Sequence, residues 1–296
     1  MYTGLNKLLD TVRSIFISMR PKQWIKNGFV FAGLVFSKSF FDLSLVLKTV
    51  YAFVLFSMVS GCVYIINDLM DKKADALHPR KSKRPIASGR LKTGAAVAAC
   101  IIILVPSLFA AFLIEPKFFG ILAGYLILVL AYSLGLKNVV ILDVIIIAAG
   151  FVLRTIGGAA AINVLISPWL IACTTFLALF LALNKRKSEL AVLSDDAPSH
   201  RANLKHYTKE LIDSMLSVVT STTIMSYALY TFTAGKSYYM MFTIPFVLYG
   251  IFRYQLLASQ SYRGESPEIL ILKDKPLLIN ILLWVAVSIF IVAYFY

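Results

Sequence analysis

The sequence is poor in cysteine, histidine and acidic side chains. Its 296 residues contain three cysteines, three histidines and only 15 acids, against 29 lysines and arginines. Cys62, Cys100 and Cys173 lie in apolar stretches without a Cys-x-x-Cys pair, which favours small core residues over a disulfide framework. No convincing Ser–His–Asp arrangement and no glycine fingerprint of a dinucleotide site is present. These kinds of chemistry therefore have no support in the sequence.

Hydrophobic residues, in contrast, make up 59% of the chain. A soluble domain of this length could not cover so much apolar surface, so we predict an all-α polytopic membrane protein. Nine candidate spans of suitable length cover 24–42, 46–67, 93–114, 118–135, 139–161, 165–184, 210–233, 238–257 and 276–295. We expect one integral-membrane domain over 1–296, in which 68–92 and 185–209 form cytoplasmic catalytic loops.

The N-terminal segment differs from these spans. Residues 5–19, LNKLLDTVRSIFISM, carry charges at helical spacing among apolar side chains. Such a pattern is typical of a helix that lies in the membrane interface. We therefore expect residues 1–22 to form an interfacial amphipathic arm rather than a span or a signal peptide.

The basic residues predict the orientation of the bundle. With the N-terminus in the cytoplasm, 24 of the 29 bases fall on the cytoplasmic side and four on the other, and Arg154 lies inside a span. This asymmetry follows the positive-inside rule and predicts an N-in, C-out protein of the cell membrane. Because orientation explains much of the net charge of +14, no nucleic-acid partner is expected. The bases are equally suited to lipid headgroups or a phosphorylated substrate.

An acidic motif follows the second span, in the stretch NDLMDKKADALHPRKSKRPIASG at 67–89. On a continuous helix, Asn67, Asp71 and Asp75 recur every four residues and share a face, which Asp68 flanks. Oxygen ligands at this spacing suit Mg²⁺, which usually shares its coordination shell with substrate phosphates. We therefore predict a magnesium site on the cytoplasmic side.

Bases follow the acids at once: Lys81, Lys83 and Arg84. A diphosphate carries more negative charge than one Mg²⁺ neutralises, so these side chains are candidates to complete the binding site. The alternative is a solvated charge run that only sets topology. Acids contribute little to topology, so the acidic motif favours the binding site.

These residues resemble a known family. NDLMDKKAD matches the NDxxDxxxD motif of the UbiA superfamily of intramembrane prenyltransferases, whose members are nine-helix bundles around a cytoplasm-facing cavity. The blocks RPKQWIKN, AYSLGLKNVVILDV, GFVLRTIGGA and NKRKSEL, together with the motif, are most similar to its decaprenyl-phosphate phosphoribosyltransferase branch. That resemblance implies Mg²⁺-dependent transfer of a 5-phosphoribosyl group from phosphoribosyl diphosphate (PRPP) to a polyprenyl phosphate. In that branch the product leads to decaprenylphosphoryl arabinose for the cell wall.

The chain departs from ordinary superfamily members after the sixth span. A second aspartate-rich motif is usual there, whereas this sequence has Lys185, Arg186 and Lys187 with Glu189, and its acids Asp195 and Asp196 fall later. Cations at this place suit a donor with one metal-bound diphosphate and a separate phosphate. The alternative is a group of positive-inside residues at a helix end.

Other polar residues of the spans are candidates for substrate contacts. Asp143 and Arg154 lie eleven residues apart and therefore on one stripe of the fifth span. Arg154 faces either a cavity or, by snorkelling, the outer interface, and Asp143 is placed to bind ribose hydroxyls. The resemblance implies phosphate contacts for Lys22 and Asn27, and Tyr132 and Lys137 end the fourth span in the same layer.

The expected reaction uses Asn67, Asp68, Asp71 and Asp75 as catalytic and metal-binding residues at the leaving pyrophosphate. Two alternatives remain open. One is a UbiA-type prenyltransferase that moves a prenyl group from its diphosphate to an aromatic acceptor. The other is a membrane transporter or scaffold, although no internal repeat is found. The sequence specifies neither the prenyl length nor the oligomeric state.

Overall fold

The fold is helical throughout the residues that the computed structural model describes, which are 2–77, 81–193, 206–233, 238–260 and 267–295. No strand occurs in these ranges. The α-helices are α1 (Tyr2–Ser18), α2 (Ala32–Phe36), α3 (Leu43–Met70), α4 (Lys72–Leu77), α5 (Thr93–Ile114), α6 (Pro116–Leu134), α7 (Leu142–Ala161), α8 (Pro168–Leu193), α9 (Lys209–Thr233), α10 (Ile244–Gln260), α11 (Pro267–Lys273) and α12 (Lys275–Phe295). Short 3-10 helices are η1 (Pro21–Phe31), η2 (Ser39–Phe41), η3 (Lys81–Lys83), η4 (Leu136–Asn138) and η6 (Tyr238–Thr243).

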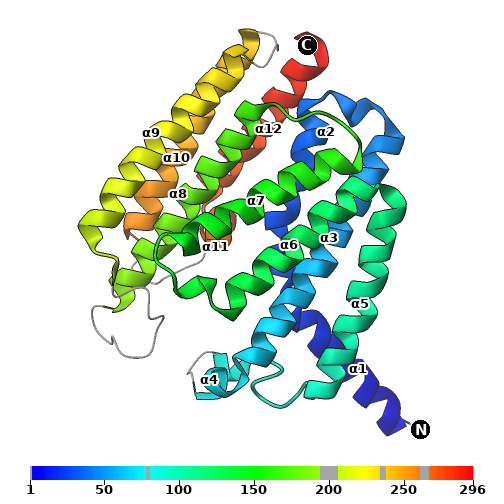
Figure 1. The fold of residues 1–296 in the computed structure, drawn as a ribbon. Coiled ribbons are helices and arrows are strands. Elements are labelled where there is room, and N and C mark those ends of the chain that lie inside the picture. Colours follow the sequence, from blue (N-terminus) through cyan, green and yellow to red (C-terminus); the bar gives the residue numbers. More distant parts are fainter. Residues whose placement is uncertain (1, 78–80, 194–205, 234–237, 261–266, 296) are drawn as a thin grey trace.

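The long helices form one bundle whose termini lie at opposite ends (Figure 1). Neighbours in sequence pack side by side, above all α8 with α9, α6 with α7, α7 with α8, and α3 with α5. α4 and the N-terminal helix α1 lie at one end, and the C-terminus lies at the other (Figure 1). The connections that carry the predicted site residues are therefore gathered at the end near α4.

Seven elements are long and apolar enough to cross a membrane: α3, α5, α6, α7, α8 as far as Ala191, the η6–α10 unit and α12. The expected span at 24–42 is instead the 3-10 helix η1 followed by the five-residue α2. The expected span at 210–233 is α9, which is long enough at 25 residues but rich in Ser and Thr. Nine crossings and the N-in, C-out orientation therefore stay predictions.

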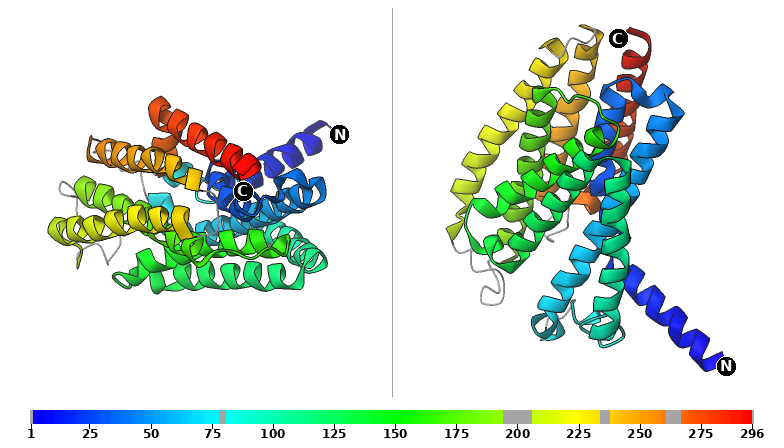
Figure 2. Two further views of the ribbon diagram at one scale, coloured as in Figure 1. Left: turned by 90° about the horizontal axis from the view of Figure 1, so that it is seen from above. Right: turned by 45° about the vertical axis from the view of Figure 1, so that its right-hand side comes forward.

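α1 projects away from the bundle (Figures 1 and 2). Its apolar Leu8, Val12 and Phe16 are exposed, whereas Ser14 and Ser18 are buried. An exposed apolar stripe agrees with the interfacial arm that we expect. The catalytic loop expected at 185–209 is partly helical instead. Helix α8 continues to Leu193, so 185–193 is helical, and 194–205 lies outside the described residues.

Close contact between α7 and η1 fixes one wall of the bundle. A Cβ atom at Gly158 would lie 1.9 Å from the carbonyl oxygen of Val30. Only glycine allows the two backbones to approach this closely. Gly158 therefore keeps η1, and the residues at its start, against the core.

We expect Gly158→Ala to destabilise the protein by about 3 kcal/mol, because η1 would have to move away from α7. Thermal unfolding in detergent measures the effect. Gly120→Ala in α6 is the matched control, since a Cβ there meets nothing within 4 Å. Equal melting temperatures for both variants would contradict this packing.

Candidate functional site

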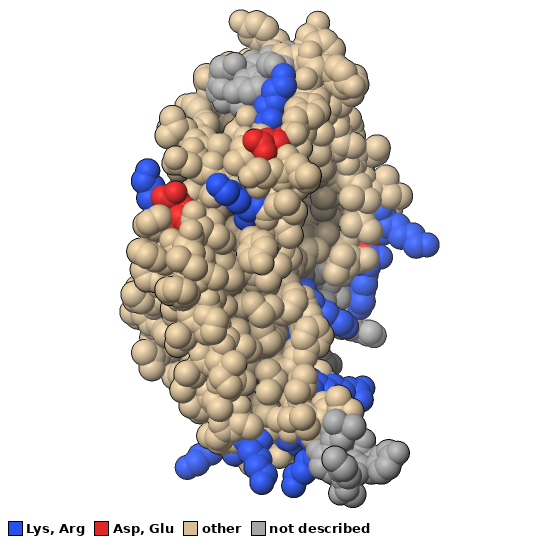
Figure 3. Space-filling model, turned by 90° about the vertical axis from the view of Figure 1, so that its right-hand side faces the viewer, with Lys and Arg blue, Asp and Glu red and all other residues tan. Residues whose placement is uncertain are grey.

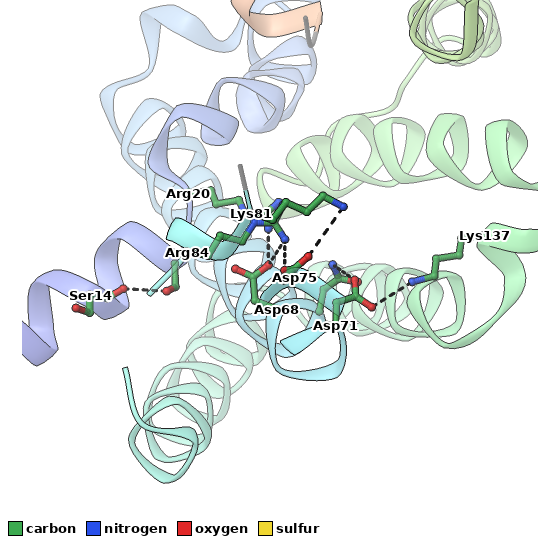
Figure 4. A network of polar contacts seen from close by, with 10 residues as sticks. Ser14, Arg20, Asp68, Asp71, Asp75, Lys81, Arg84 and Lys137 are labelled. Atoms are coloured by element: carbon green, nitrogen blue, oxygen red, sulfur yellow. Dashed lines mark hydrogen bonds and ion pairs between the residues drawn. The ribbon is translucent and has the colours of Figure 1, made fainter. Parts of the chain in front are cut away.

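The acidic motif forms a cluster of ion pairs where α3 ends (Figure 4). Asp68 at the end of α3 and Asp75 in α4 are each only 2% exposed. Both contact one atom, Nη1 of Arg84, at 3.1 Å from Asp68 Oδ1 and 2.5 Å from Asp75 Oδ2. Lys81 Nζ lies 4.0 Å from the other oxygen of Asp75. Two buried carboxylates thus share one cation.

This pairing differs from the predicted column of Asn67, Asp71 and Asp75. Asp68 and Asp75 converge on Arg84, whereas Asp71 contacts Lys137 instead. A continuous helix would have kept Asp71 and Asp75 within about 40° of each other. α3 ends at Met70 and α4 begins at Lys72, so Asp71 caps the first helix.

Asp71 and Asn67 face the connection between α6 and α7. Asn67 Nδ2 donates to Asp71 Oδ2 at 3.3 Å, and Lys137 Nζ lies 3.8 Å from Asp71 Oδ1. The carboxylate of Asp71 is 36% exposed, whereas Asp68 and Asp75 are buried. It is therefore the acid of the motif that an incoming ligand meets most easily.

Arg20 completes the cluster and was not among the predicted site residues. Its Nη2 lies 2.5 Å from Asp68 Oδ1, and its guanidinium stacks on Tyr64 at 4.8 Å from the ring centroid. The backbone of Arg20 is left-handed, with φ 53°, although Pro21 follows. This strained conformation turns the chain from α1 into η1. The sequence offered one clue, since Arg20 opens the block RPKQWIKN.

The donor set of this cluster fits a hard divalent cation. Carboxylate and amide oxygens are the ligands that Mg²⁺ prefers, and Asp68 and Asp75 already share one cationic atom. In the structure, however, the three carboxylates are balanced by four bases, Arg20, Lys81, Arg84 and Lys137. Within the described ranges, no three acidic, His or Cys side chains are arranged to hold a metal. Arg84 occupies the place between the two buried carboxylates.

A second charged cluster lies around Arg186 of α8, which is 1% exposed. Its Nε lies 3.0 Å from Oδ2 of Asp143, which is 0% exposed at the start of α7. Arg186 also pairs with Glu189 and approaches the Tyr132 hydroxyl at 3.5 Å. Lys185 lies 4.0 Å from Glu189. The predicted residues Tyr132, Asp143, Lys185, Arg186 and Glu189 are therefore brought together.

Tyr207 belongs to this second cluster and was not among the predicted site residues. Its hydroxyl donates to Asp143 Oδ1 at 2.7 Å and accepts from the Ile141 N–H at 2.8 Å. Burial and the hydrogen bond to Asp143 raise the pKa of Tyr207 to about 12. The hydroxyl therefore keeps its proton at neutral pH and remains a donor.

Asn27 and Arg154 meet deeper in the bundle, away from the acids. Arg154 Nε donates to Asn27 Oδ1 at 2.7 Å, its Nη1 to the Gly150 carbonyl and its Nη2 to the Tyr125 hydroxyl, each at 2.8 Å. Asn27 in turn donates to the hydroxyl of Ser57 at 3.0 Å. The guanidinium is buried and held by neutral acceptors. The Arg154 side chain therefore joins η1 to α7, and the alternative in which it snorkels to the outer interface is wrong.

The remaining candidates are exposed or lie outside the described residues. Lys22 and Lys83 are exposed. Asp195 and Asp196 lie outside the described ranges. The two charged clusters are connected by the segment between α6 and α7, because Lys137 contacts Asp71 and Asp143 contacts Arg186. On the face drawn in Figure 3, which is hollowed, Lys and Arg gather toward the lower end.

Comparisons with known proteins point in one direction. Residues 28–270 match the model of the UbiA prenyltransferase family. Decaprenyl-phosphate phosphoribosyltransferase of Mycolicibacterium smegmatis is 31% identical over 292 residues, covering 93% of this chain and 91% of that protein. The proteins of the same name from Corynebacterium glutamicum and Mycobacterium tuberculosis are 30% and 29% identical, covering 90% and 94% of this chain and 83% and 93% of theirs.

Solved structures agree in fold. A UbiA homolog from Archaeoglobus fulgidus bound to GPP and Mg²⁺ superposes with a TM-score of 0.71 at 21% identity, covering 95% of this chain and 99% of that one. At this identity the match shows the fold alone. The chain therefore belongs to the UbiA prenyltransferase family and is a multi-pass membrane transferase.

Proposed function

We propose that the protein transfers a 5-phosphoribosyl group from PRPP to a polyprenyl phosphate and releases pyrophosphate. The observation that carries this proposal is the match, over at least 90% of this chain, to relatives named decaprenyl-phosphate phosphoribosyltransferase. The three consecutive bases Lys185, Arg186 and Lys187, in place of a second aspartate-rich motif, support a donor with a separate phosphate group.

The diphosphate of PRPP is assigned to the cluster around Asp68, Asp71 and Asp75, which we call the acidic cluster. Its three carboxylates are outnumbered by four bases, so the cluster as a whole has a net positive charge and attracts an anion. Asn67, Asp68, Asp71 and Asp75 would hold Mg²⁺, which when bound supplies charge neutralisation on the leaving pyrophosphate. Arg84 would then donate to phosphate oxygens instead of to Asp68 and Asp75.

The ribose and its 5-phosphate are assigned to the second cluster. Lys185 is partly exposed beside Glu189 and is available to a phosphate. Arg186 and Asp143 lie behind it with Tyr132, and they orient the surface that the ribose meets. Lys22 and Lys83 are exposed at the same end of the chain's fold and are proposed as further phosphate contacts. For Asn27 and Arg154, the contacts favour a structural role near the lipid path.

The acceptor needs little activation. The second pKa of a phosphate monoester is about 6, so the lipid phosphate is already anionic at neutral pH. Ribosyl transfer has oxocarbenium character, and stabilising the leaving group together with positioning supplies most of the acceleration. A general base is therefore not required. His206 is exposed, and His78 and His200 lie outside the described residues.

The cellular setting follows from the same proposal. The site faces the cytoplasm, where PRPP is dissolved, and the prenyl tail lies among the apolar helices of the cell membrane. The product serves as a lipid-linked pentose precursor for the cell wall or another glycan, as in the arabinan pathway of the resembling branch.

Incubation of membranes with PRPP labelled in the ribose and with polyprenyl phosphate tests the proposal. We expect label in the lipid fraction that depends on Mg²⁺. The solved A. fulgidus homolog bound GPP, so the competing assay offers a labelled prenyl diphosphate and an aromatic acceptor. Label in the aromatic product alone would overturn the proposal, as would solute counterflow in proteoliposomes without any transfer.

A further inference from the structure

The segment that leads into α7 contains a strained turn. Ile141 has φ 69° and ψ −46°, and the Leu142 N–H donates to the Val140 carbonyl at 2.8 Å. This is a γ-turn with positive φ, which is rare and strained, and more so for a β-branched residue. Such a conformation persists only where neighbouring groups hold it.

The Tyr207 hydroxyl is the group that holds this turn. It accepts from the Ile141 N–H at 2.8 Å and donates to Asp143 Oδ1 at 2.7 Å, so one oxygen binds both sides of the turn. Tyr207 is 2% exposed and packs in one core cluster with Val144 and Phe180. Asp143 and Tyr207 lie 64 residues apart in the sequence. Their hydrogen bond therefore joins the segment before α9 to the start of α7.

Both charged clusters depend on the same short segment. Four residues before the turn, Lys137 contacts Asp71 at 3.8 Å. Two residues after it, Asp143 contacts Arg186 at 3.0 Å. A change in the backbone at Ile141 would therefore displace one charged contact on each side.

We propose that Tyr207 is a positioning residue for the donor site: its hydroxyl locks the γ-turn at Ile141 and thereby fixes the buried pair of Asp143 and Arg186 behind the surface that PRPP meets. This inference rests on the proposed function for its effect on PRPP, but the lock itself is a structural claim that can be tested separately.

Tyr207→Phe removes the hydroxyl and keeps the ring packing. We expect the amide of Ile141 to exchange hydrogen about tenfold faster, and the KM for PRPP to rise about tenfold with kcat changed less than about threefold. KM is the sensitive quantity because the second cluster is proposed to bind the 5-phosphate and the ribose hydroxyls, at which no bond forms or breaks. Hydrogen exchange with mass spectrometry in nanodiscs and the lipid-labelling assay measure the two effects.

Two further variants separate positioning from general stability. Tyr227→Phe is the matched control, because the Tyr227 hydroxyl is also bonded, to Thr243 at 2.6 Å and Trp284 at 2.8 Å. Tyr227 is buried in a different core cluster from Tyr207. We expect normal KM and normal exchange at Ile141. Ile141→Gly should reduce the effect of Tyr207→Phe on KM to less than about threefold, since glycine adopts positive φ without strain.

Normal exchange at Ile141 in Tyr207→Phe would overturn the lock. An equal rise of KM in Tyr227→Phe, or an undiminished effect in the Ile141→Gly background, would overturn the positioning role. If the unmodified protein transfers nothing from PRPP, the proposed function fails, and exchange at Ile141 still decides whether Tyr207 locks the turn.

Discussion

Replacing Asp71 with alanine is expected to lower phosphoribosyl transfer about a thousandfold while the protein stays folded. Asp71 is the exposed acid of the cluster, bonded to Asn67 and facing Lys137. The Asp71 carboxylate would act through the proposed Mg²⁺, and losing the stabilisation of developing charge typically costs about 10²–10³ in rate. The measurement is label transfer from PRPP at increasing Mg²⁺ concentrations.

The control for this experiment is Asp213→Ala. Asp213 is also partly exposed and also paired with a lysine, since Lys187 Nζ lies 2.6 Å from it. Its loss removes a similar ion pair from α9 and should leave activity within about twofold, as surface pairs contribute little. Full activity of Asp71→Ala, or equal losses in both variants, would refute the role of the acidic cluster.

Arg186→Met is expected to lower the free energy of unfolding by about 3–5 kcal/mol. The substitution leaves the buried carboxylate of Asp143 without its cationic partner. Removing one member of a buried ion pair is costly because the other charge stays desolvated. Thermal unfolding in detergent measures the loss.

Adding Asp143→Asn to Arg186→Met should restore most of this stability. The new side-chain amide carries no charge, and its oxygen can still accept the hydrogen bond from the Tyr207 hydroxyl. Activity should not return, because Glu189 and Tyr132 have lost the Arg186 contacts that are proposed to orient the surface the ribose meets. Recovery of activity together with stability would show that the pair is structural only, and an unchanged melting temperature in Arg186→Met would contradict the buried pair itself.

Hydropathy predicted most of the helices, but not their local form. The span expected at 93–114 coincides with α5, Thr93–Ile114, because an uninterrupted apolar run has only one solution in a bilayer. The segment at 24–42 carries Lys26, Asn27 and Lys38 among its apolar residues, and it forms η1 and the short α2. Its shape depends on packing against Gly158 of α7, which no local pattern contains.

The site was predictable where its partners lie close in sequence. The acids of α3 and α4 and the bases after them fall within one stretch, so Asp68, Asp75 and Arg84 were recognised, although their pairing was not. Arg20 and Tyr207 were missed because they lie 48 and 64 residues from the carboxylates that they bind. Contacts over such distances are set by the fold. The roles of all these residues in catalysis remain predictions.

Mass spectrometry of the lipid made by the purified protein distinguishes phosphoribosyl transfer from the alternatives. With PRPP and polyprenyl phosphate as the substrates, we expect a lipid heavier by one phosphoribosyl group and one pyrophosphate released for each lipid modified. An unchanged polyprenyl phosphate, or a prenyl tail found on another acceptor, would contradict this expectation.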